Sequence, residues 1–187
     1  RRQGFDYWKV LECTHDYQNS EYYDGNDQTI KKWSGYDAFA QTDDACEYIR
    51  QHLDKPFFLT LSLGPPHFPH HNAPDAFQTR FSPEDVQFSP NAVFEDPETE
   101  AFARKEAAGY YAHIAALDGC IGSVVETLKV AGLEDNTILI FASDHGEMMG
   151  SHDRDPYIKQ IFWDESCHVP YLLRYPPLTS GQQGRQV

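Results

Sequence analysis

The 187-residue chain is predicted to fold as an α/β domain with a partly parallel sheet flanked by helices. Short apolar runs bounded by proline, glycine or polar residues alternate with segments of helical periodicity, and such runs are typical of buried strands. Strands joined through helices usually lie parallel to each other. The hydrophobic content of 40% suits one folded domain, and no apolar run approaches the roughly 18 residues of a membrane span.

The first part of the chain lacks a clear periodicity. Residues 1–36 are rich in Tyr, Trp, Asp, Asn and Gly, so we expect a loop-rich segment with short strands before a core of residues 37–187. A helix is predicted over 37–53, with Asp37 as a candidate N-cap and Pro56 just beyond its end. It is indicated by apolar residues at near-helical spacing: Phe39, Cys46, Ile49 and Leu53.

A strand and a long loop follow. The run "FFLTLSL" at 57–63 predicts a buried strand, because it is short, apolar and bounded by Pro56 and Gly64. Residues 64–97 are rich in proline, and aromatic residues recur among them, so we expect a long ordered loop.

The second half predicts one long helix and two more strands. The helix is indicated by apolar residues that step by three or four: Tyr110, Ile114, Leu117, Ile121, Val124 and Leu128. Gly132 followed by Leu133 predicts a Schellman ending for this helix. The segments "DNTILIFAS" (135–143) and "HVPYLLRYP" (168–176) predict the second and third strands.

Charge and cysteine usage exclude some functions. The formal net charge of −14 argues against non-specific nucleic-acid binding, although a bound cation could still bring an anionic substrate to the protein. The four cysteines are widely spaced and form no C-x-x-C pair, so we expect free, partly buried thiols instead of a zinc site. The opening "RRQGFDYWKV" has neither Met nor a signal peptide, so we expect the chain to be part of a longer protein.

Candidate site residues follow two of the predicted strands. In open α/β sheets, ligands bind beyond the carboxyl ends of the strands. The 57–63 run leads into "GPPHFPHH", which contains His67, and the 137–142 run leads into "SDHGEMMGSHD", which contains Asp144 and His145. If these strands are parallel, both groups lie at the same rim of one sheet.

Local sequence leaves the role of these residues open. Asp144 and His145 could bind one cation, since carboxylates suit Ca²⁺ or Mg²⁺ and imidazoles favour Mn²⁺ or Zn²⁺, or they could be a strand-terminating Asp and a surface His. His67 could equally be an ordinary loop residue. By the same local reasoning Lys159 is a solvated helix lysine. Four others have weaker indications: His70 and His71 as loop polar residues, Glu147 as a helix-start residue, and His152 as a site or turn-capping residue.

Three stretches resemble the sulfatases of the alkaline-phosphatase superfamily. They are "KPFFLTLSLGPPHFPHHNAP" (55–74), "YYAHIAALDGCIGSVVETLKVAGLEDNTILIFASDHGEMMGSH" (110–152) and "KQIFWDESCHVPYLLRYP" (159–176). The opening "GFDYW" and the "TDDACEYIRQ" helix fit the same pattern. The resemblance implies an alkaline-phosphatase-like fold and hydrolysis of a sulfate ester. His145, where many relatives carry Asn, resembles the iduronate-, choline- and phosphonate-type branch.

The resemblance also implies roles for individual residues. Asp144 and His145 would be ligands of a divalent cation, usually Ca²⁺ and alternatively Mn²⁺ or Mg²⁺. His67 would contact the sulfate and help to protonate the leaving oxygen, and Lys159 would neutralise sulfate or leaving-group charge. The implied substrate is a sulfate-ester small molecule or a sulfated sugar, with no nucleic-acid or membrane partner, and the implied location is periplasmic or secreted.

One departure from the family is large. The family's nucleophile is a formylglycine made in a C/S-x-P-S-R motif, and the 187 residues contain no such motif. Two acidic metal ligands of the family are expected before Arg1. We therefore expect a central piece of a sulfatase that does not turn over substrate alone. Two alternatives stay open: a phosphodiester or phosphonate monoester hydrolase of the same superfamily, and a non-catalytic module that binds anions or metal weakly or oligomerises.

Overall fold

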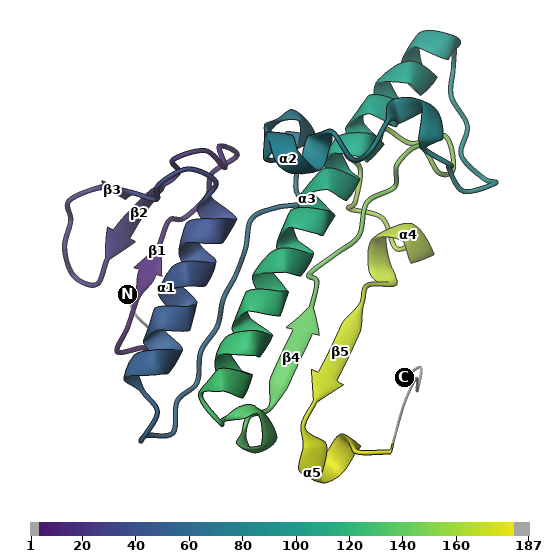
Figure 1. Cartoon of the computed structure of the whole chain (residues 1–187). Helices are drawn as coiled ribbons and strands as arrows, with labels where there is room; N and C mark the ends of the chain where they lie inside the picture. Colours follow the sequence, from purple (N-terminus) through teal and green to yellow (C-terminus); the bar gives the residue numbers. More distant parts are fainter. Residues whose placement is uncertain (1–3, 182–187) are drawn as a thin grey trace.

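The computed structural model describes residues 4–181 (Figure 1). The N-terminal part forms a three-stranded antiparallel sheet with β2 in the middle. Its strands are β1 (Lys9–Val10), β2 (Glu21–Asp24) and β3 (Lys31–Lys32). They occupy the segment for which the composition indicated loops and short strands.

Two helices form the main core. α1 (Asp37–Gln51) and α3 (Pro97–Val130) pack against each other, which confirms both predicted helices (Figure 1). The predicted N-cap of α1 is wrong by one residue: Tyr36 is the N-cap and makes no side-chain capping bond. Asp37 is already helical, and its buried carboxylate accepts a hydrogen bond of 2.8 Å from the Ser20 hydroxyl instead. Because a distant serine supplies this donor, local sequence could not show it.

Small side chains fill the contact between α1 and α3. Ala38 of α1 meets Ala116 and Cys120 of α3 in one buried cluster, together with Tyr17 and Tyr36. Small residues at the crossing allow two helices to approach closely. The larger apolar residues that revealed α3 in the sequence mostly lie beside this buried stripe, since Tyr110, Leu117, Ile121 and Val124 are half-buried, Ile114 is exposed and only Leu128 is buried.

Both ends of α3 follow recognisable capping chemistry. The Asp96 carboxylate accepts a hydrogen bond of 2.8 Å from the Thr99 N–H, and Pro97 occupies the first helical position. At the other end Gly132 has φ +68°, and the Leu133 N–H donates to the Leu128 carbonyl over 2.9 Å. This confirms the predicted Schellman ending.

The strands of the second half pair differently from the prediction. β4 (Leu139–Ala142) and β5 (Tyr171–Arg174) form an antiparallel pair, and every ladder within residues 4–181 is antiparallel. Residues 57–63 are extended, but they form no strand, because no strand of the described part pairs with them and a ladder defines a strand. Figure 1 shows that this segment and β4 nevertheless run in the same direction along α3.

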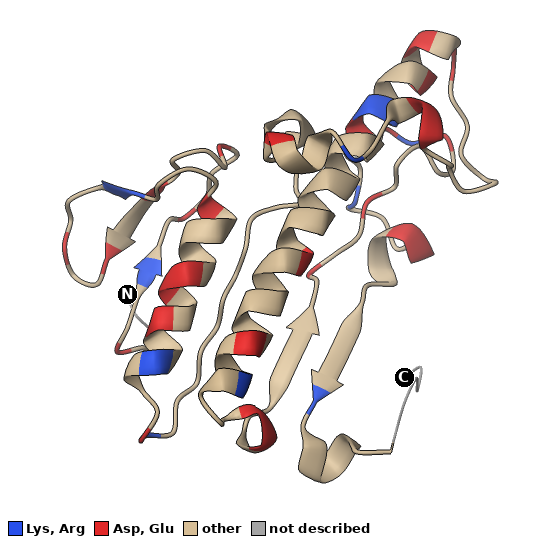
Figure 2. Ribbon diagram, in the orientation of Figure 1, with Lys and Arg blue, Asp and Glu red and all other residues tan. Residues whose placement is uncertain are grey.

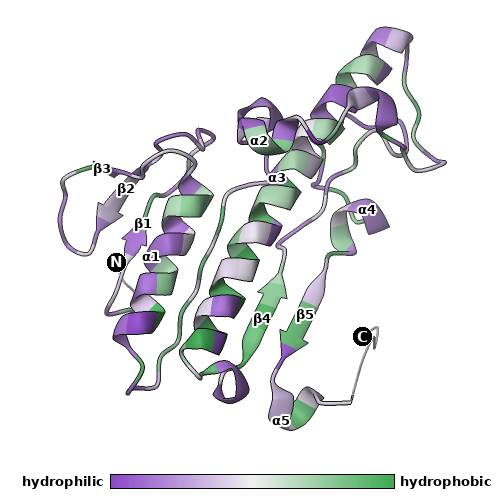
Figure 3. Cartoon of the chain, in the orientation of Figure 1, coloured by the Kyte–Doolittle hydropathy of each residue, from purple (hydrophilic) through white to green (hydrophobic). Residues whose placement is uncertain are grey.

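The two paired strands are apolar but not fully buried. Figure 3 shows β4 as hydrophobic throughout and β5 as hydrophobic in its middle. β4 alternates between half-buried and exposed residues, and β5 is exposed along its whole length. The expectation of buried strands is therefore wrong for both: β5 is exposed, and β4 is only half-buried on one face.

Short helices lie in the segments that connect the main helices and strands. The proline-rich loop contains η1 (His70–Asn72), α2 (Asp75–Gln78) and η2 (Pro83–Asp85), all of which contact α3. The remaining short helices are η3 (Glu134–Asn136), α4 (Asp164–Cys167) and α5 (Pro176–Thr179).

Acidic residues dominate the charged surface of the helices. Figure 2 shows them along α1 and α3 and on α4, with far fewer basic segments. Within residues 4–181 no helix has both the length and the apolar character needed to cross a membrane. All four thiols are free, as expected: Cys46 and Cys120 are buried, and Cys13 and Cys167 are exposed.

His113 lies fully buried on α3 and joins three parts of the fold. Its Nδ1 lies 2.6 Å from the Tyr36 hydroxyl, and its Nε2 lies 3.4 Å from the Pro69 carbonyl oxygen. Since a carbonyl only accepts, Nε2 carries the proton and Nδ1 accepts from tyrosine. Burial lowers the pKa of His113 from the usual 6.5 to about 4, because an imidazolium would lose its hydration there.

We expect His113 to make folding sensitive to acid. Because the pKa of His113 is lower in the folded than in the unfolded state, neutral His113 favours the folded state. This contribution to the free energy of unfolding is complete above about pH 6.5. As the pH falls toward 4 it is lost, by up to about 3 kcal/mol. His113→Gln should lower stability at pH 7 and flatten this pH dependence. Urea denaturation between pH 4 and 7 measures both effects, and an unchanged slope in the variant would assign the acid sensitivity to other groups.

Gly146 lies where the loop after β4 meets α4. Its N–H donates to the Ser166 carbonyl over 2.8 Å, and a Cβ at this position would lie 2.0 Å from the Glu165 carbonyl oxygen. Such a contact is too short for any side chain, so the backbone would have to shift.

Gly146→Ala should therefore destabilise the protein by about 1–3 kcal/mol, as overpacking does. Gly122→Ala is the matched control, because nothing lies within 4 Å of an added Cβ there and alanine favours a helix over glycine. Thermal and urea unfolding of both variants provide the comparison. Equal stability of the two would contradict the close packing of the loop on α4.

Candidate active site

Three of the predicted site residues converge from separate loops. The rings of His67 and His145 have centroids 6.4 Å apart and meet at 68°. Lys159 places its Nζ 5.3 Å from the centroid of the Phe68 ring, next to His67. The two clusters do lie close together, as expected, but the prediction that they share the rim of one sheet is wrong for the described residues, because 57–63 joins no sheet there.

His67 is held in one tautomer. Its Nδ1 lies 2.9 Å from the Phe68 carbonyl oxygen, which can only accept, so Nδ1 carries the proton and Nε2 keeps a free lone pair. His15 stacks on the ring with centroids 4.8 Å apart, a contact for which the sequence offered no signal. Burial lowers the pKa of His67, and the nearby Lys159, His15 and His145 lower it further. The ring is therefore neutral at neutral pH, and an anion bound beside it would favour its protonation.

Asp144 and His145 form a pair of side chains with ligand atoms accessible to a cation. The Asp144 side chain is 87% exposed, and its Oδ2 lies 3.6 Å from Nε2 of His145. Nδ1 of His145 donates to the Gly146 carbonyl over 2.8 Å, so Nε2 is free to bind a cation. A metal-binding histidine commonly fixes its other nitrogen on a carbonyl in this way.

Asp144 and His145 have the chemistry of cation ligands but are only two side chains. A carboxylate and a free imidazole nitrogen suit a divalent cation. Within residues 4–181, no group of three or more His, Cys, Asp or Glu side chains is arranged to hold a metal ion. The pair therefore fits a cation only with ligands additional to those described.

Lys159 differs from its expected setting. It lies in a loop instead of a solvated helix, its side chain is 12% exposed, and its Nζ is 3.1 Å from Oε1 of Glu147. Glu147 is not a helix-start residue either: it lies in the loop after β4 with a 4% exposed side chain. Burial raises the pKa of Glu147, and Lys159 opposes that rise. In the sequence, the only indication of the contact between Glu147 and Lys159 is that Glu147 lies two residues after His145.

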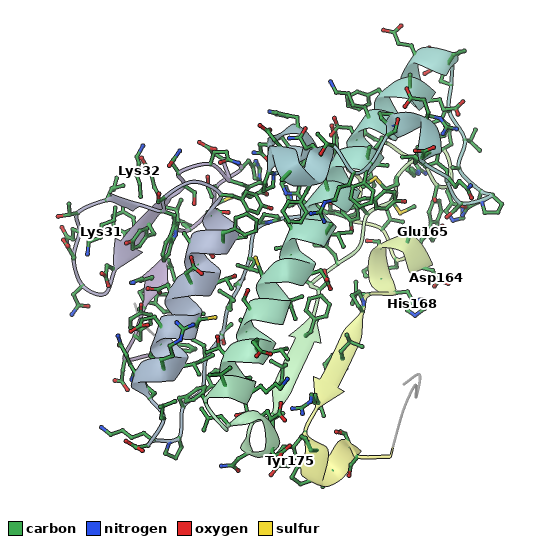
Figure 4. All side chains as sticks on the ribbon, in the orientation of Figure 1. Lys31, Lys32, Asp164, Glu165, His168 and Tyr175 are labelled. Atoms are coloured by element: carbon green, nitrogen blue, oxygen red, sulfur yellow. The ribbon has the colours of Figure 1, made fainter. Side chains whose placement is uncertain are left out.

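Of the other histidines named in the sequence analysis, His70 and His152 contact acidic residues of α3 and α4. His70 lies in the proline-rich loop, as expected, but it is buried there, with Nδ1 2.9 Å from Oε2 of Glu106. His71 is exposed. His152 has φ +57° and lies 3.4 Å from Oε1 of Glu165, the α4 residue labelled in Figure 4. It joins the loop after β4 to α4.

Two hollows of the structure lie away from the candidate site. A hollow of about 680 Å³ lies between α1 and α3, where Cys46, Leu53 and Val130 line it. A second hollow of about 530 Å³ is lined by Tyr36 and Asn72 among others. None of the four predicted site residues lines either hollow.

Comparison with known proteins identifies the family. The sequence signature described as "Sulfatase" matches residues 1–187. An ulvan-active sulfatase of Formosa agariphila is 47% identical over 178 residues, which cover 94% of this chain and 34% of that protein. An endo-4-O-sulfatase of Bacteroides thetaiotaomicron is 30% identical over 184 residues, which cover 94% of this chain and 35% of that protein. The chain thus spans about a third of the length of these relatives.

Solved structures agree with the sequence relatives. The yidJ protein of Bacteroides fragilis, described as a candidate sulfatase, matches with a TM-score of 0.83 and 30% identity over 94% of this chain and 39% of that one. The phosphonate monoester hydrolase of Agrobacterium radiobacter matches with a TM-score of 0.67 and 28% identity over 80% of this chain and 34% of that one. The fold is therefore that of the alkaline-phosphatase-like sulfatases. With the family signature along its whole length and this fold, the chain belongs to the sulfatase family.

Proposed function

We propose that this chain supplies part of the active site of a sulfuric ester hydrolase. The observation that supports it most is the convergence of His67, His145 and Lys159 beside the exposed carboxylate of Asp144. Transfer from a sulfate ester requires fixed positive charge around oxygens that become more negative in the transition state. A cation bound near an ammonium group meets that requirement.

Asp144 and His145 are the proposed cation ligands. Their donor atoms suit Ca²⁺, and Mn²⁺ or Mg²⁺ are the alternatives. When bound, a divalent cation polarises sulfate oxygens and offsets the negative charge of the protein around them. Ligands that complete the coordination, and the formylglycine nucleophile, would come from residues outside this chain, since the chain contains no C/S-x-P-S-R motif.

His67 and Lys159 are the proposed substrate-contacting residues. The ammonium of Lys159 would attract a sulfate oxygen or the leaving oxygen. His67 presents Nε2, which would take up a proton when the anion binds and give it to the departing alcohol. Saccharide sulfate esters are the proposed substrates, supported by the relative that acts on ulvan. A periplasmic or secreted location remains a proposal that rests on resemblance.

The test compares this chain with a longer protein that contains it and carries the formylglycine motif. We expect the longer protein to release sulfate from p-nitrophenyl sulfate and from ulvan oligosaccharides, and to lose activity with a chelator. The chain alone should release none, because the covalent route needs a nucleophile that it lacks. Sulfate release by the chain alone would contradict this assignment. Faster hydrolysis of a phenylphosphonate monoester would instead favour the phosphonate hydrolases that share the fold.

Lys159→Ala in the longer protein should lower kcat/KM by on the order of 10²–10³, the usual cost of removing a preorganised charge donor. Because Glu147 would be left buried without a partner, the free energy of unfolding should also fall, by up to about 3–5 kcal/mol. Lys129→Ala is the control, since its ion pair with Glu126 is exposed and should change stability by no more than about 0.5 kcal/mol. Steady-state kinetics and urea denaturation give both quantities; unchanged kinetics would remove Lys159 from the site.

A further inference from the structure

The ion pair between Glu147 and Lys159 is buried, unlike most lysine pairs of this chain. The side chains are 4% and 12% exposed, whereas those of Glu126 and Lys129 are 64% and 63% exposed. Oε1 of Glu147 contacts Nζ of Lys159, while Oε2 is buried and has no hydrogen-bond partner in the described part of the chain. The ammonium has three N–H groups, and this contact uses one of them.

Buried and half-buried side chains of two other elements lie around Glu147. His70 and Tyr110 are close enough to interact with its charge, and their rings meet edge to face with centroids 5.6 Å apart. His70 is itself fixed by Glu106 on α3. Among residues 4–181, Nε2 of His70, like Oε2 of Glu147, is buried without a hydrogen-bond partner. Glu147 is therefore held between α3 and the proline-rich loop.

The backbones that carry the pair are also joined. The Met148 N–H donates to the Ile158 carbonyl over 3.1 Å, and Met148 is fully buried. The Ser166 hydroxyl donates to the carbonyl of Lys159. Each partner of the ion pair thus has a neighbour or backbone group anchored in the fold, and the pair has little freedom to move.

We propose that Glu147 is a positioning residue that aims the ammonium of Lys159 at the anion site beside His67 and His145. This inference rests on the proposed function of that site. A lysine has a flexible four-carbon stem, so a single charge contact at its end decides where the ammonium lies. The loop that supplies the proposed cation ligands Asp144 and His145 also supplies this contact, so one loop would set the positions of both positive charges.

A double-mutant cycle in the longer protein tests whether Glu147 acts through Lys159. Glu147→Gln keeps the shape and removes the charge, and it should lower kcat by on the order of 10- to 100-fold while KM changes less. In the Lys159→Ala background the same substitution should change kcat by less than about 2-fold, since the group it positions is gone. Glu126→Gln, in an exposed pair on α3, is the matched control and should leave kcat unchanged. Equal losses in both backgrounds would overturn the proposal.

A second measurement keeps this inference separate from the proposed function. Acetylation by N-hydroxysuccinimide acetate, followed by mass spectrometry of the same proteins, reports how well each lysine is held. Lys159 should react more slowly than Lys129 in the wild type. After Glu147→Gln, Lys159 should react several-fold faster than in the wild type, while the reactivity of Lys129 does not change.

If sulfate release is absent but labelling changes as expected, only the proposed function fails. If labelling of Lys159 does not change, the positioning role fails. Glu147→Asp, which keeps the charge on a shorter stem, replaces Glu147→Gln should the latter not fold, with a smaller expected effect in both assays.

Discussion

The rim of the candidate site depends on how the proline-rich loop is fixed to α3. Two buried contacts on consecutive residues hold it: the Pro69 carbonyl faces His113, and Nδ1 of His70 bonds to Glu106. Both partners lie on the same stretch of α3, so the helix acts as a template for the loop. His67 lies two residues before the first contact. Its ring can meet that of His145 because these contacts define the path of the loop.

The candidate site differs in its surroundings from the acidic surfaces of the helices. The formal net charge is −14, and acidic groups lie along the exposed sides of α1 and α3 (Figure 2). The site lies instead among aromatic and histidine side chains, where Lys159 passes over Phe68 and His67 stacks on His15. The burial of Lys159 strengthens its electrostatic interactions. It also makes an unpaired charge costly, which explains why Lys159 is accompanied by Glu147.

Family resemblance and structure contribute different information about this site. The motifs single out His67, Asp144, His145 and Lys159 by their place in a pattern. The structure adds contacts that support the proposed roles. Backbone carbonyls fix the tautomers of His67 and His145, and the buried carboxylate of Glu147 pairs with the ammonium of Lys159. The roles of the four residues remain predictions, and the added contacts give physical reasons for them.

The sequence by itself determined the two long helices, the end of α3 and the candidate residues. Helical periodicity and capping depend on residues a few positions apart, so local patterns can reveal them, as at Gly132. Only the tertiary structure decided the antiparallel pairing of β4 with β5, the lack of a strand partner for 57–63 in the described part of the chain, and the burial of Lys159. Strand direction and burial depend on partners distant in the chain, and a short apolar run or a single lysine carries no information about which partner will meet it.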